Sequence, residues 1–210
     1  KAPESYVRKL FDSYAKGFDD HLANKLGYKI PALMRKSVDG VTDVQETFQR
    51  ALDLGCGTGL VAESFLDRIK KIDGVDLSPK MLEQAETKAV YNTLYRQDLL
   101  EFLEGPEIQE SEYDLVLSAD TFIYVGRLDQ IFAAVGRALK DGGLFVFSVE
   151  QLDKGDYKLL SSGRYSQSNA YITNLATDYG FSIVICDPVV IRTENNQPIP
   201  GNIFILRAAT

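Results

Sequence analysis

Short apolar runs alternate with helical stretches along the chain from about residue 51 onward. The apolar runs, which are typical of β-strands, lie at Ala51–Leu54, Ile72–Val75, Thr93–Arg96, Tyr113–Ser118 and Leu144–Val149. The stretches typical of helices lie between them, at Val61–Ile69, Pro79–Val90 and Leu128–Leu139. This alternation predicts an α/β domain in which helices cover both faces of a parallel sheet.

Two local signals support the helix boundaries. Ser78–Pro79 offers an N-cap residue followed by proline at the first helical position. Lys140–Gly143 supplies a cation and then glycines, a combination that is typical of a helix end.

The last third of the chain departs from the alternation. A helical run at Asn169–Tyr179 ends at Gly180 and precedes the apolar run Phe181–Cys186. A polar stretch that contains proline separates this run from a second one at Ile203–Leu206. Because no helix lies between the two runs, we expect them to pair as an antiparallel hairpin.

The N-terminal segment has a helical pattern of its own. Apolar side chains recur at three- and four-residue steps, at Val7, Phe11, Tyr14, Phe18 and Leu22. We expect one or two helices between Ser5 and about Leu33, and strand-like patterns only after Gly40. The chain therefore divides into a helical segment, residues 1–40, and one compact domain, residues 41–210.

Composition narrows the class of protein. The 210 residues are 45% hydrophobic and 25% charged, and no apolar run approaches the length of a membrane span. The first residues lack the apolar core of a signal peptide, so we expect a cytoplasmic protein. With 30 acidic and 23 basic side chains, the net charge of -7 disfavours binding to nucleic acid.

Few residues are available for metal or hydrolase chemistry. Cys56, Cys186 and a single histidine, His21, indicate neither a metal site nor a disulfide framework. A serine hydrolase is disfavoured because no Gly-x-Ser-x-Gly turn occurs.

A glycine-rich turn, LDLGCGTGL at Leu52–Leu60, follows the first predicted strand. Turns of this kind let a nucleotide-like ligand approach the main chain. A dinucleotide site requires Gly-x-Gly-x-x-Gly, but Leu60 stands where the third glycine would follow Gly55 and Gly57. The acidic Asp53 also lies two residues before Gly55, where the dinucleotide pattern asks only for a strand. The turn therefore favours a nucleoside without a pyrophosphate.

Five segments in order carry a resemblance to a known family: LDLGCGTG, GVDLSPKML, QDLLEF, YDLVLSADTF and LKDGGLFVFS. From Ala51 onward the chain resembles the class I S-adenosylmethionine-dependent methyltransferases. This resemblance implies a Rossmann-like fold with a mostly parallel seven-stranded sheet, a C-terminal antiparallel hairpin and an N-terminal helical lid. It implies S-adenosylmethionine as cofactor and S-adenosylhomocysteine as product.

The resemblance also implies roles for individual residues. The backbone of the turn would approach the methionine and ribose portions of the cofactor, at Asp53, Gly55, Cys56, Gly57 and Gly59. Asp76, followed by Leu77, would accept hydrogen bonds from the ribose hydroxyls. Asp98 would accept one from the adenine amino group, and Leu99 and Met81 would sandwich the ring. The backbone at Ser118 and Ala119 would hold the cofactor's ammonium group.

Plainer interpretations stay open for these residues. The glycines can form a mere tight connection, Asp76 can cap a helix, and Asp98 can be a solvated loop acid. The N-terminal stripe can be ordinary core packing. In the resemblance, however, FDSYAKGFDDHL lids the cofactor, which makes Tyr14 and Phe18 cofactor contacts.

The segment YAKGFDDHLANKLGYKIPALM resembles a bacterial group of predicted methyltransferases that follow tetratricopeptide repeats. Because the chain also begins without methionine, we expect a domain of a longer protein.

Transfer of an activated methyl group requires mainly that the acceptor is held close to it and, for some acceptors, a base. The candidates for catalysis are His21 and Tyr124, and those for substrate binding are Arg164 and Tyr165. Ser118–Thr121 lacks the Asn/Asp-Pro-Pro-aromatic turn of amide and base methyltransferases.

We therefore expect methyl transfer to an oxygen, nitrogen or carbon atom of a small molecule. The alternatives are a protein acceptor, a catalytically silent cofactor-binding module and, less favoured, a nicotinamide oxidoreductase.

Overall fold

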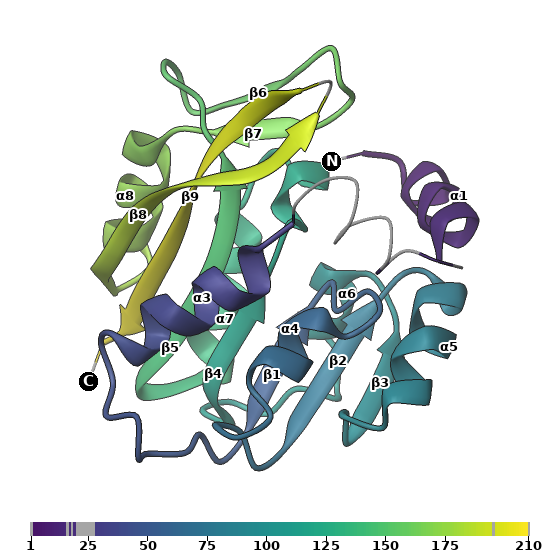
Figure 1. Cartoon of the computed structure of the whole chain (residues 1–210). Helices are drawn as coiled ribbons and strands as arrows, with labels where there is room; N and C mark the ends of the chain where they lie inside the picture. Colours follow the sequence, from purple (N-terminus) through teal and green to yellow (C-terminus); the bar gives the residue numbers. More distant parts are fainter. Residues whose placement is uncertain (1, 16, 18, 20–27, 195, 210) are drawn as a thin grey trace.

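The computed structural model of the chain describes residues 2–15, 17, 19, 28–194 and 196–209. A seven-stranded sheet forms its centre, in the order β3-β2-β1-β4-β5-β9-β8 (Figure 1). The strands are β1 Ala51–Leu54, β2 Ile72–Asp76, β3 Thr93–Arg96, β4 Tyr113–Ser118, β5 Leu139–Glu150, β8 Phe181–Glu194 and β9 Gln197–Ala208. β1 to β5 run parallel, whereas β9 pairs antiparallel with both β5 and β8.

Helices follow the strands as the alternation predicts. They are α1 Glu4–Tyr14, α3 Ile30–Asp39, α4 Leu60–Ser64, α5 Pro79–Lys88, α6 Leu99–Leu103, the 3-10 turn η1 Phe122–Tyr124, α7 Asp129–Ala138 and α8 Asn169–Asp178. A second, two-stranded sheet pairs β6 Tyr157–Leu159 with β7 Tyr165–Gln167. The predicted α/β fold and C-terminal antiparallel hairpin are confirmed.

Two apolar layers lie on opposite faces of the sheet because successive strand residues point to opposite sides. Leu52 and Val116 pack with Phe102 of α6, Phe132 of α7 and Leu175 of α8. On the other face, the adjacent strand residues Ala51, Leu115 and Leu117 pack against α3 and α4. The helix residues in this layer are Ile30, Met34, Val38, Val61 and Ala62. The sheet is thus covered on both sides.

The N-terminal segment is not uniform. Four residues of α3 are buried, at Ile30, Pro31, Met34 and Val38. In contrast, α1 has no buried residue. The part of the predicted apolar stripe that falls in α1, at Val7, Phe11 and Tyr14, is therefore not ordinary core. Phe18 and Leu22 lie outside the described residues.

Three sequence expectations need correction. Lys140–Gly143 is not a helix cap, because Leu139 already pairs with Tyr113 and the segment begins β5. The proline-containing stretch after Cys186 is not a loop, since β8 and β9 pair through it as far as Glu194 and Gln197. The helix predicted at Val61–Ile69 is the short α4, which ends at Ser64.

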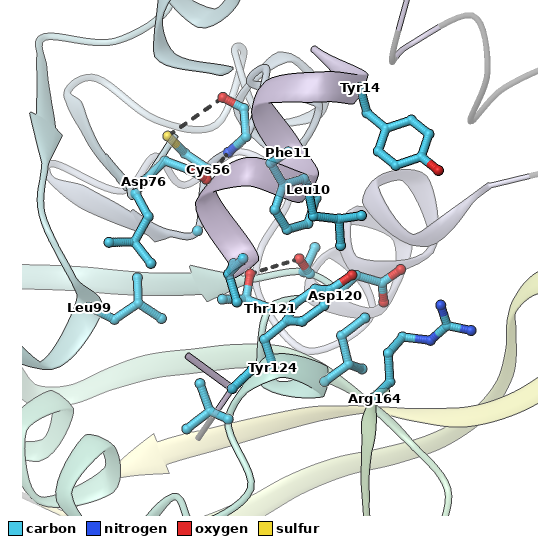
Figure 2. A pocket seen from close by; sticks show the side chains of 18 of the residues that line it. Leu10, Phe11, Tyr14, Cys56, Asp76, Leu99, Asp120, Thr121, Tyr124 and Arg164 are labelled. Atoms are coloured by element: carbon cyan, nitrogen blue, oxygen red, sulfur yellow. Dashed lines mark hydrogen bonds between the residues drawn. The ribbon is translucent and has the colours of Figure 1, made fainter. Parts of the chain in front are cut away.

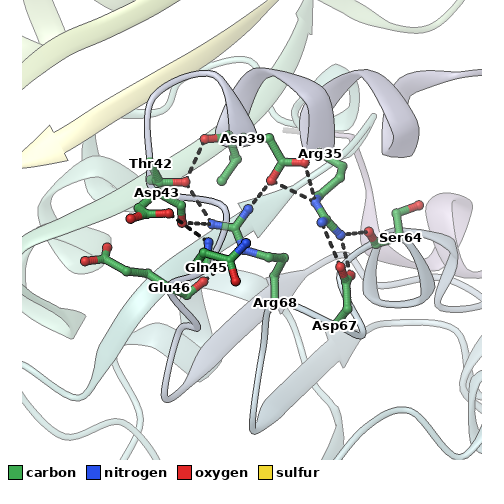
Figure 3. A network of polar contacts seen from close by, with 10 residues as sticks. Arg35, Asp39, Thr42, Asp43, Gln45, Glu46, Ser64, Asp67 and Arg68 are labelled. Atoms are coloured by element: carbon green, nitrogen blue, oxygen red, sulfur yellow. Dashed lines mark hydrogen bonds and ion pairs between the residues drawn. The ribbon is translucent and has the colours of Figure 1, made fainter.

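A buried arginine, Arg68, lies in the turn after α4 (Figure 3). Arg68 is 1% exposed and donates from Nε to the Glu46 carbonyl at 3.0 Å. Its Nη2 donates to Thr42 Oγ1 at 2.9 Å and to the Asp43 carbonyl at 3.0 Å, and its Nη1 pairs with Asp39. One guanidinium therefore joins the end of α3, the loop before β1 and the turn after α4.

We expect Arg68→Met to lower the free energy of unfolding by about 3 kcal/mol, because the Asp43 and Glu46 carbonyls lose their donor and Asp39 keeps only Arg35 as a cationic partner. Arg35→Met is the matched control. Arg35 also pairs with Asp39, but its other partner, Asp67, has a side chain that is 70% exposed, so the loss of Arg35 should cost about 1 kcal/mol. Urea unfolding measures both, and equal losses would contradict the central place given to Arg68.

Candidate active site

A cavity of about 550 Å³ opens at the carboxyl ends of the parallel strands. The segments after β1, β2, β3 and β4 line it, together with α1 and the end of β8. Figure 2 shows Cys56, Asp76 and Leu99 on one side of this cavity and Asp120, Tyr124 and Arg164 on the other. Ligands of open α/β sheets bind at this edge.

The three glycines of the turn after β1 serve different purposes. All have positive φ angles, of 73° at Gly55, 53° at Gly57 and 92° at Gly59. A Cβ on Gly55 would lie 2.2 Å from Thr121 Oγ1, and one on Gly59 would lie 3.1 Å from the Tyr91 ring. A Cβ on Gly57 would meet nothing within 4 Å. Gly57 lines the cavity and therefore forms a cradle that a side chain would fill.

Asp76 ends β2 and lines the same cavity. Its Oδ2 accepts from the Gly57 N–H at 3.0 Å and its Oδ1 from the Ser78 N–H at 2.8 Å. Burial raises the pKa of Asp76 to about 6, although these N–H groups oppose the shift. The N-cap of α5 is Ser78, whose Oγ accepts from the Met81 N–H at 3.2 Å. A cap is therefore already present without Asp76.

Asp98 and Leu99 lie beyond β3, where both line the cavity. Asp98 is 4% exposed and is the N-cap of α6, accepting from the Leu100 N–H at 3.0 Å. It is thus a buried capping residue at the cavity wall and not a solvated loop acid. Leu77 and Cys56 complete this end, and burial raises the pKa of the Cys56 thiol.

Several predicted cofactor residues lie behind the cavity wall. Gly59, Met81 and Ser118 do not line it, and Ser118 Oγ donates to the Leu54 carbonyl at 3.0 Å. Asp53 is also fully buried behind the wall. Its Oδ2 accepts from the Tyr91 hydroxyl at 2.8 Å, and its Oδ1 has no partner among the described residues. Burial raises the pKa of Asp53 to about 7.

Of the predicted catalytic and lid residues, the structure describes only Tyr14 and Tyr124. Tyr14 is half exposed and lines the cavity, as does Tyr124, whose ring centroid lies 5.3 Å from that of Phe11. Burial raises the pKa of Tyr124 to about 12. His21 and Phe18 lie outside the described residues. Their roles stay predictions.

The opposite end of the cavity is strongly charged, and sequence reasoning missed most of it. Asp120, Arg192 and Glu194 line it beside Ala119 and the predicted Arg164. Tyr165 does not line it, and its ring lies 6.4 Å from that of Tyr157. Arg192 and Glu194 stand two residues apart in β8, on one side of the strand. This two-residue spacing could have indicated a charged strand face, but it lies in the stretch predicted from the sequence to be a loop.

Among the described residues, no group of histidine, cysteine or carboxylate side chains is arranged to hold a metal ion. No helix there has the length and apolar character required to cross a membrane.

Known proteins resemble this chain in sequence and in fold. Residues 52–147 match the family described as a methyltransferase domain. The malonyl-[acyl-carrier protein] O-methyltransferase of Geobacter sulfurreducens is 36% identical over 145 residues, which cover 68% of this chain and 52% of that protein. The chain thus spans about half the length of the curated relatives that it matches.

Two solved structures share the fold. A S-adenosylmethionine-dependent methyltransferase from Clostridium acetobutylicum is 18% identical with a TM-score of 0.68, over 96% of this chain and 100% of that one. A phosphoethanolamine N-methyltransferase from Haemonchus contortus, solved with phosphomonomethylethanolamine and S-adenosylhomocysteine, is 20% identical with a TM-score of 0.66, over 84% and 52%.

The chain belongs to the class I S-adenosylmethionine-dependent methyltransferases. The predicted family, enzyme class and cofactor, S-adenosylmethionine, are thereby confirmed.

Gly57→Ala should weaken S-adenosylhomocysteine binding at least about 10-fold, because the new methyl group enters the cavity, while stability falls by only about 1 kcal/mol. Gly55→Ala should instead lower the free energy of unfolding by about 2 kcal/mol, because its methyl group collides with Thr121. Calorimetry and urea unfolding of both variants separate the two effects. Unchanged affinity in Gly57→Ala would contradict the assignment of this end to the cofactor.

The buried Asp53 should make the ligand-free protein lose stability as the pH rises. Because its pKa is raised in the folded protein, Asp53 ionises more easily in the unfolded chain. The stability that protonated Asp53 contributes is complete below about pH 4 and is lost as the pH rises through about 7. The free energy of unfolding should therefore fall by about 2 kcal/mol less between pH 5.5 and pH 8 in Asp53→Asn than in the unaltered protein. Urea unfolding at both pH values measures it, and parallel pH profiles would show that Asp53 does not titrate as described.

Proposed function

We propose that the domain transfers the methyl group of S-adenosylmethionine to an oxygen, nitrogen or carbon atom of a small-molecule acceptor. The observation that carries the proposal is the pairing of Asp76 with the Gly57 N–H inside the cavity. This pairing fixes a carboxylate beside a bare stretch of backbone. A carboxylate so held can accept hydrogen bonds from vicinal hydroxyls, and the bare backbone admits the rest of a nucleoside.

The residues divide the cavity between donor and acceptor. Gly57 and Asp76 would hold the ribose end of the cofactor, and Leu99 would pack against the adenine ring. When bound, the cofactor supplies an activated methyl group on sulfur. The charged end, with Asp120, Tyr124 and Arg164, is then left for the acceptor. This second end supports a catalyst over a silent cofactor-binding module.

The acceptor is proposed as a class and not as a compound. The relatives' names mention malonyl-[acyl-carrier protein] and phosphomonomethylethanolamine, which differ in chemistry. A volume of about 550 Å³ that the cofactor must share favours a small acceptor group. A protein side chain is the alternative. A cytoplasmic location, the lack of nucleic-acid binding and a longer parent chain with upstream repeats stay predictions.

We further propose that α1 acts as the lid of this site. It contributes Val7, Leu10, Phe11 and Tyr14 to the cavity although none of its residues is buried. Figure 1 shows α1 beside α5 and away from α3 and α8. Ser78 Oγ donates to Asp12 at 2.7 Å, and the Ala2 N–H donates to the Tyr124 carbonyl at 3.0 Å. These hydrogen bonds attach α1 and the residue before it to the wall of the site.

Asp76→Asn should weaken S-adenosylhomocysteine binding about 10- to 100-fold, because hydrogen bonds to a charged group contribute about 1.5–3 kcal/mol each. Glu86→Gln, an equal charge change on an exposed part of α5, is the control. Calorimetry measures both affinities.

The proposed lid is tested by hydrogen exchange on the same samples. Exchange in Glu4–Tyr14 should become slower when S-adenosylhomocysteine is added.

Incubation of a metabolite extract with labelled S-adenosylmethionine then tests the transfer. We expect label in a small product. Binding without any labelled product would support the silent module, and label only in protein would support the protein acceptor. Equal affinities in Asp76→Asn and Glu86→Gln would remove Asp76 from the site.

A further inference from the structure

Five charged side chains meet at the acceptor end of the cavity. They are Asp120 after β4, Glu150 at the end of β5, Arg164 before β7, and Arg192 and Glu194 in β8. Two are cations and three are anions. The cluster therefore carries one surplus negative charge, and its position decides which acceptor fits.

Four of the five groups neutralise one another. Arg192 pairs with Glu150 and donates from Nε to Glu194 at 2.6 Å. Arg164 donates from Nε to Glu150 at 3.1 Å and from Nη2 to Glu194 at 2.6 Å. Each arginine thus contacts both glutamates. Bidentate and shared contacts of this kind hold the guanidinium groups in place.

The surplus charge lies on Asp120. The closest cation, Arg192 Nη1, is 3.6 Å from Asp120 Oδ2, longer than any other pair in the cluster. The other oxygen, Oδ1, accepts from Ser148 Oγ at 3.0 Å. Asp120 has a φ angle of 50°, a conformation that aspartate and asparagine tolerate better than most residues. Its side chain lines the cavity beside Thr121 and Tyr124 (Figure 2).

The surroundings of Asp120 suit a cation. Aromatic side chains line the same cavity, at Phe11, Tyr14, Tyr28 and Tyr124. Aromatic faces together with a carboxylate attract ammonium groups. Burial raises the pKa of Asp120 to about 6, while Arg192, Arg164 and Ser148 lower it and Glu150 raises it. Burial and the nearby Asp120 and Asp53 raise the pKa of Tyr28, so its hydroxyl stays protonated.

We propose that the acceptor is a small molecule with a protonated primary or secondary amine, which Asp120 binds as the ammonium ion and then deprotonates. The inference rests on the proposed function and names its acceptor class. An ammonium ion supplies the one positive charge that the cluster lacks.

The step balances in atoms and charge. The N–H proton passes to the Asp120 carboxylate, which becomes a neutral acid. The freed nitrogen lone pair attacks the methyl carbon, a C–N bond forms, and the C–S bond breaks with its electron pair on sulfur. The products are an N-methylammonium ion and the neutral thioether, S-adenosylhomocysteine. Ser148 and Arg192 hold the proton acceptor, Asp120, in position.

An anionic acceptor fits less well. It would have to draw Arg164 or Arg192 away from Glu150 and Glu194, and Arg192 has only 6% of its side chain exposed. Breaking a buried ion pair leaves an uncompensated charge. A neutral alcohol would enter without this cost but would leave Asp120 uncompensated.

The test uses the complex with S-adenosylhomocysteine and three probes of similar shape: 2-phenylethylamine, 2-phenylethanol and 3-phenylpropionate. We expect calorimetry at pH 7.5 to show binding of the amine at least about 10-fold tighter than of the other two. Asp120→Asn should remove this preference. Glu86→Gln makes the same change in charge on an exposed part of α5, outside the cavity lining, and should keep it.

A preference for the alcohol or the carboxylate, binding of none of the three, or an amine preference that persists in Asp120→Asn would overturn the inference. The affinity of each variant for S-adenosylhomocysteine, measured first, reports whether the site is intact. If the unaltered protein binds no S-adenosylhomocysteine, the proposed function fails. If it binds the thioether but not the amine, only the acceptor class fails.

Discussion

The close approach of two loops at the centre of the sheet determines where the site forms. β1 lies between β2 and β4, so the connections that leave β1 and β4 pass to opposite faces and open a crevice between them. Gly55 lets the first loop touch Thr121 of the second, and Thr121 Oγ1 donates to the Leu54 carbonyl at 3.2 Å. This contact closes the floor of the crevice. The bare backbone at Gly57 then faces the cavity and not the protein interior.

Buried carboxylates surround that crevice at a cost in stability. Asp53 lies just before the end of β1, Asp76 at the end of β2 and Asp120 shortly after β4, and burial raises the pKa of each. A fold selected for stability alone would place apolar groups there. The arrangement makes sense if ligands with hydroxyl groups and positive charge replace the lost water. Sites of perturbed pKa are commonly functional for this reason.

The glycine-rich turn and Asp76 could be placed at the cavity from the sequence, whereas most of the charged end of the cavity could not. The glycines and Asp76 stand within a few residues of strands whose apolar runs are short and clear, so the sheet edge follows from local patterns. Arg192 and Glu194 reach the cavity only because β8 continues past Pro188 and pairs with β9 as far as Gln197. Arg192 and Glu194 are near each other in sequence, but Glu150, the partner of Arg192, is 42 residues away from it. Long-range ion pairs leave no local pattern.

The hairpin of β8 and β9 therefore contributes both to the core and to the cavity, and the pattern of apolar residues does not distinguish these two roles. Its apolar residues Ile203 and Ile205 complete one layer of the core and make the sheet stable. Its polar end carries Arg192 and Glu194 over the mouth of the cavity and neutralises Glu150 and Arg164. Because the donor end depends on β1 to β3 and the acceptor end on the hairpin, the polar end can change without disturbing the cofactor cradle. The charge left on Asp120 therefore depends on how the polar end of the hairpin pairs with Glu150 and Arg164.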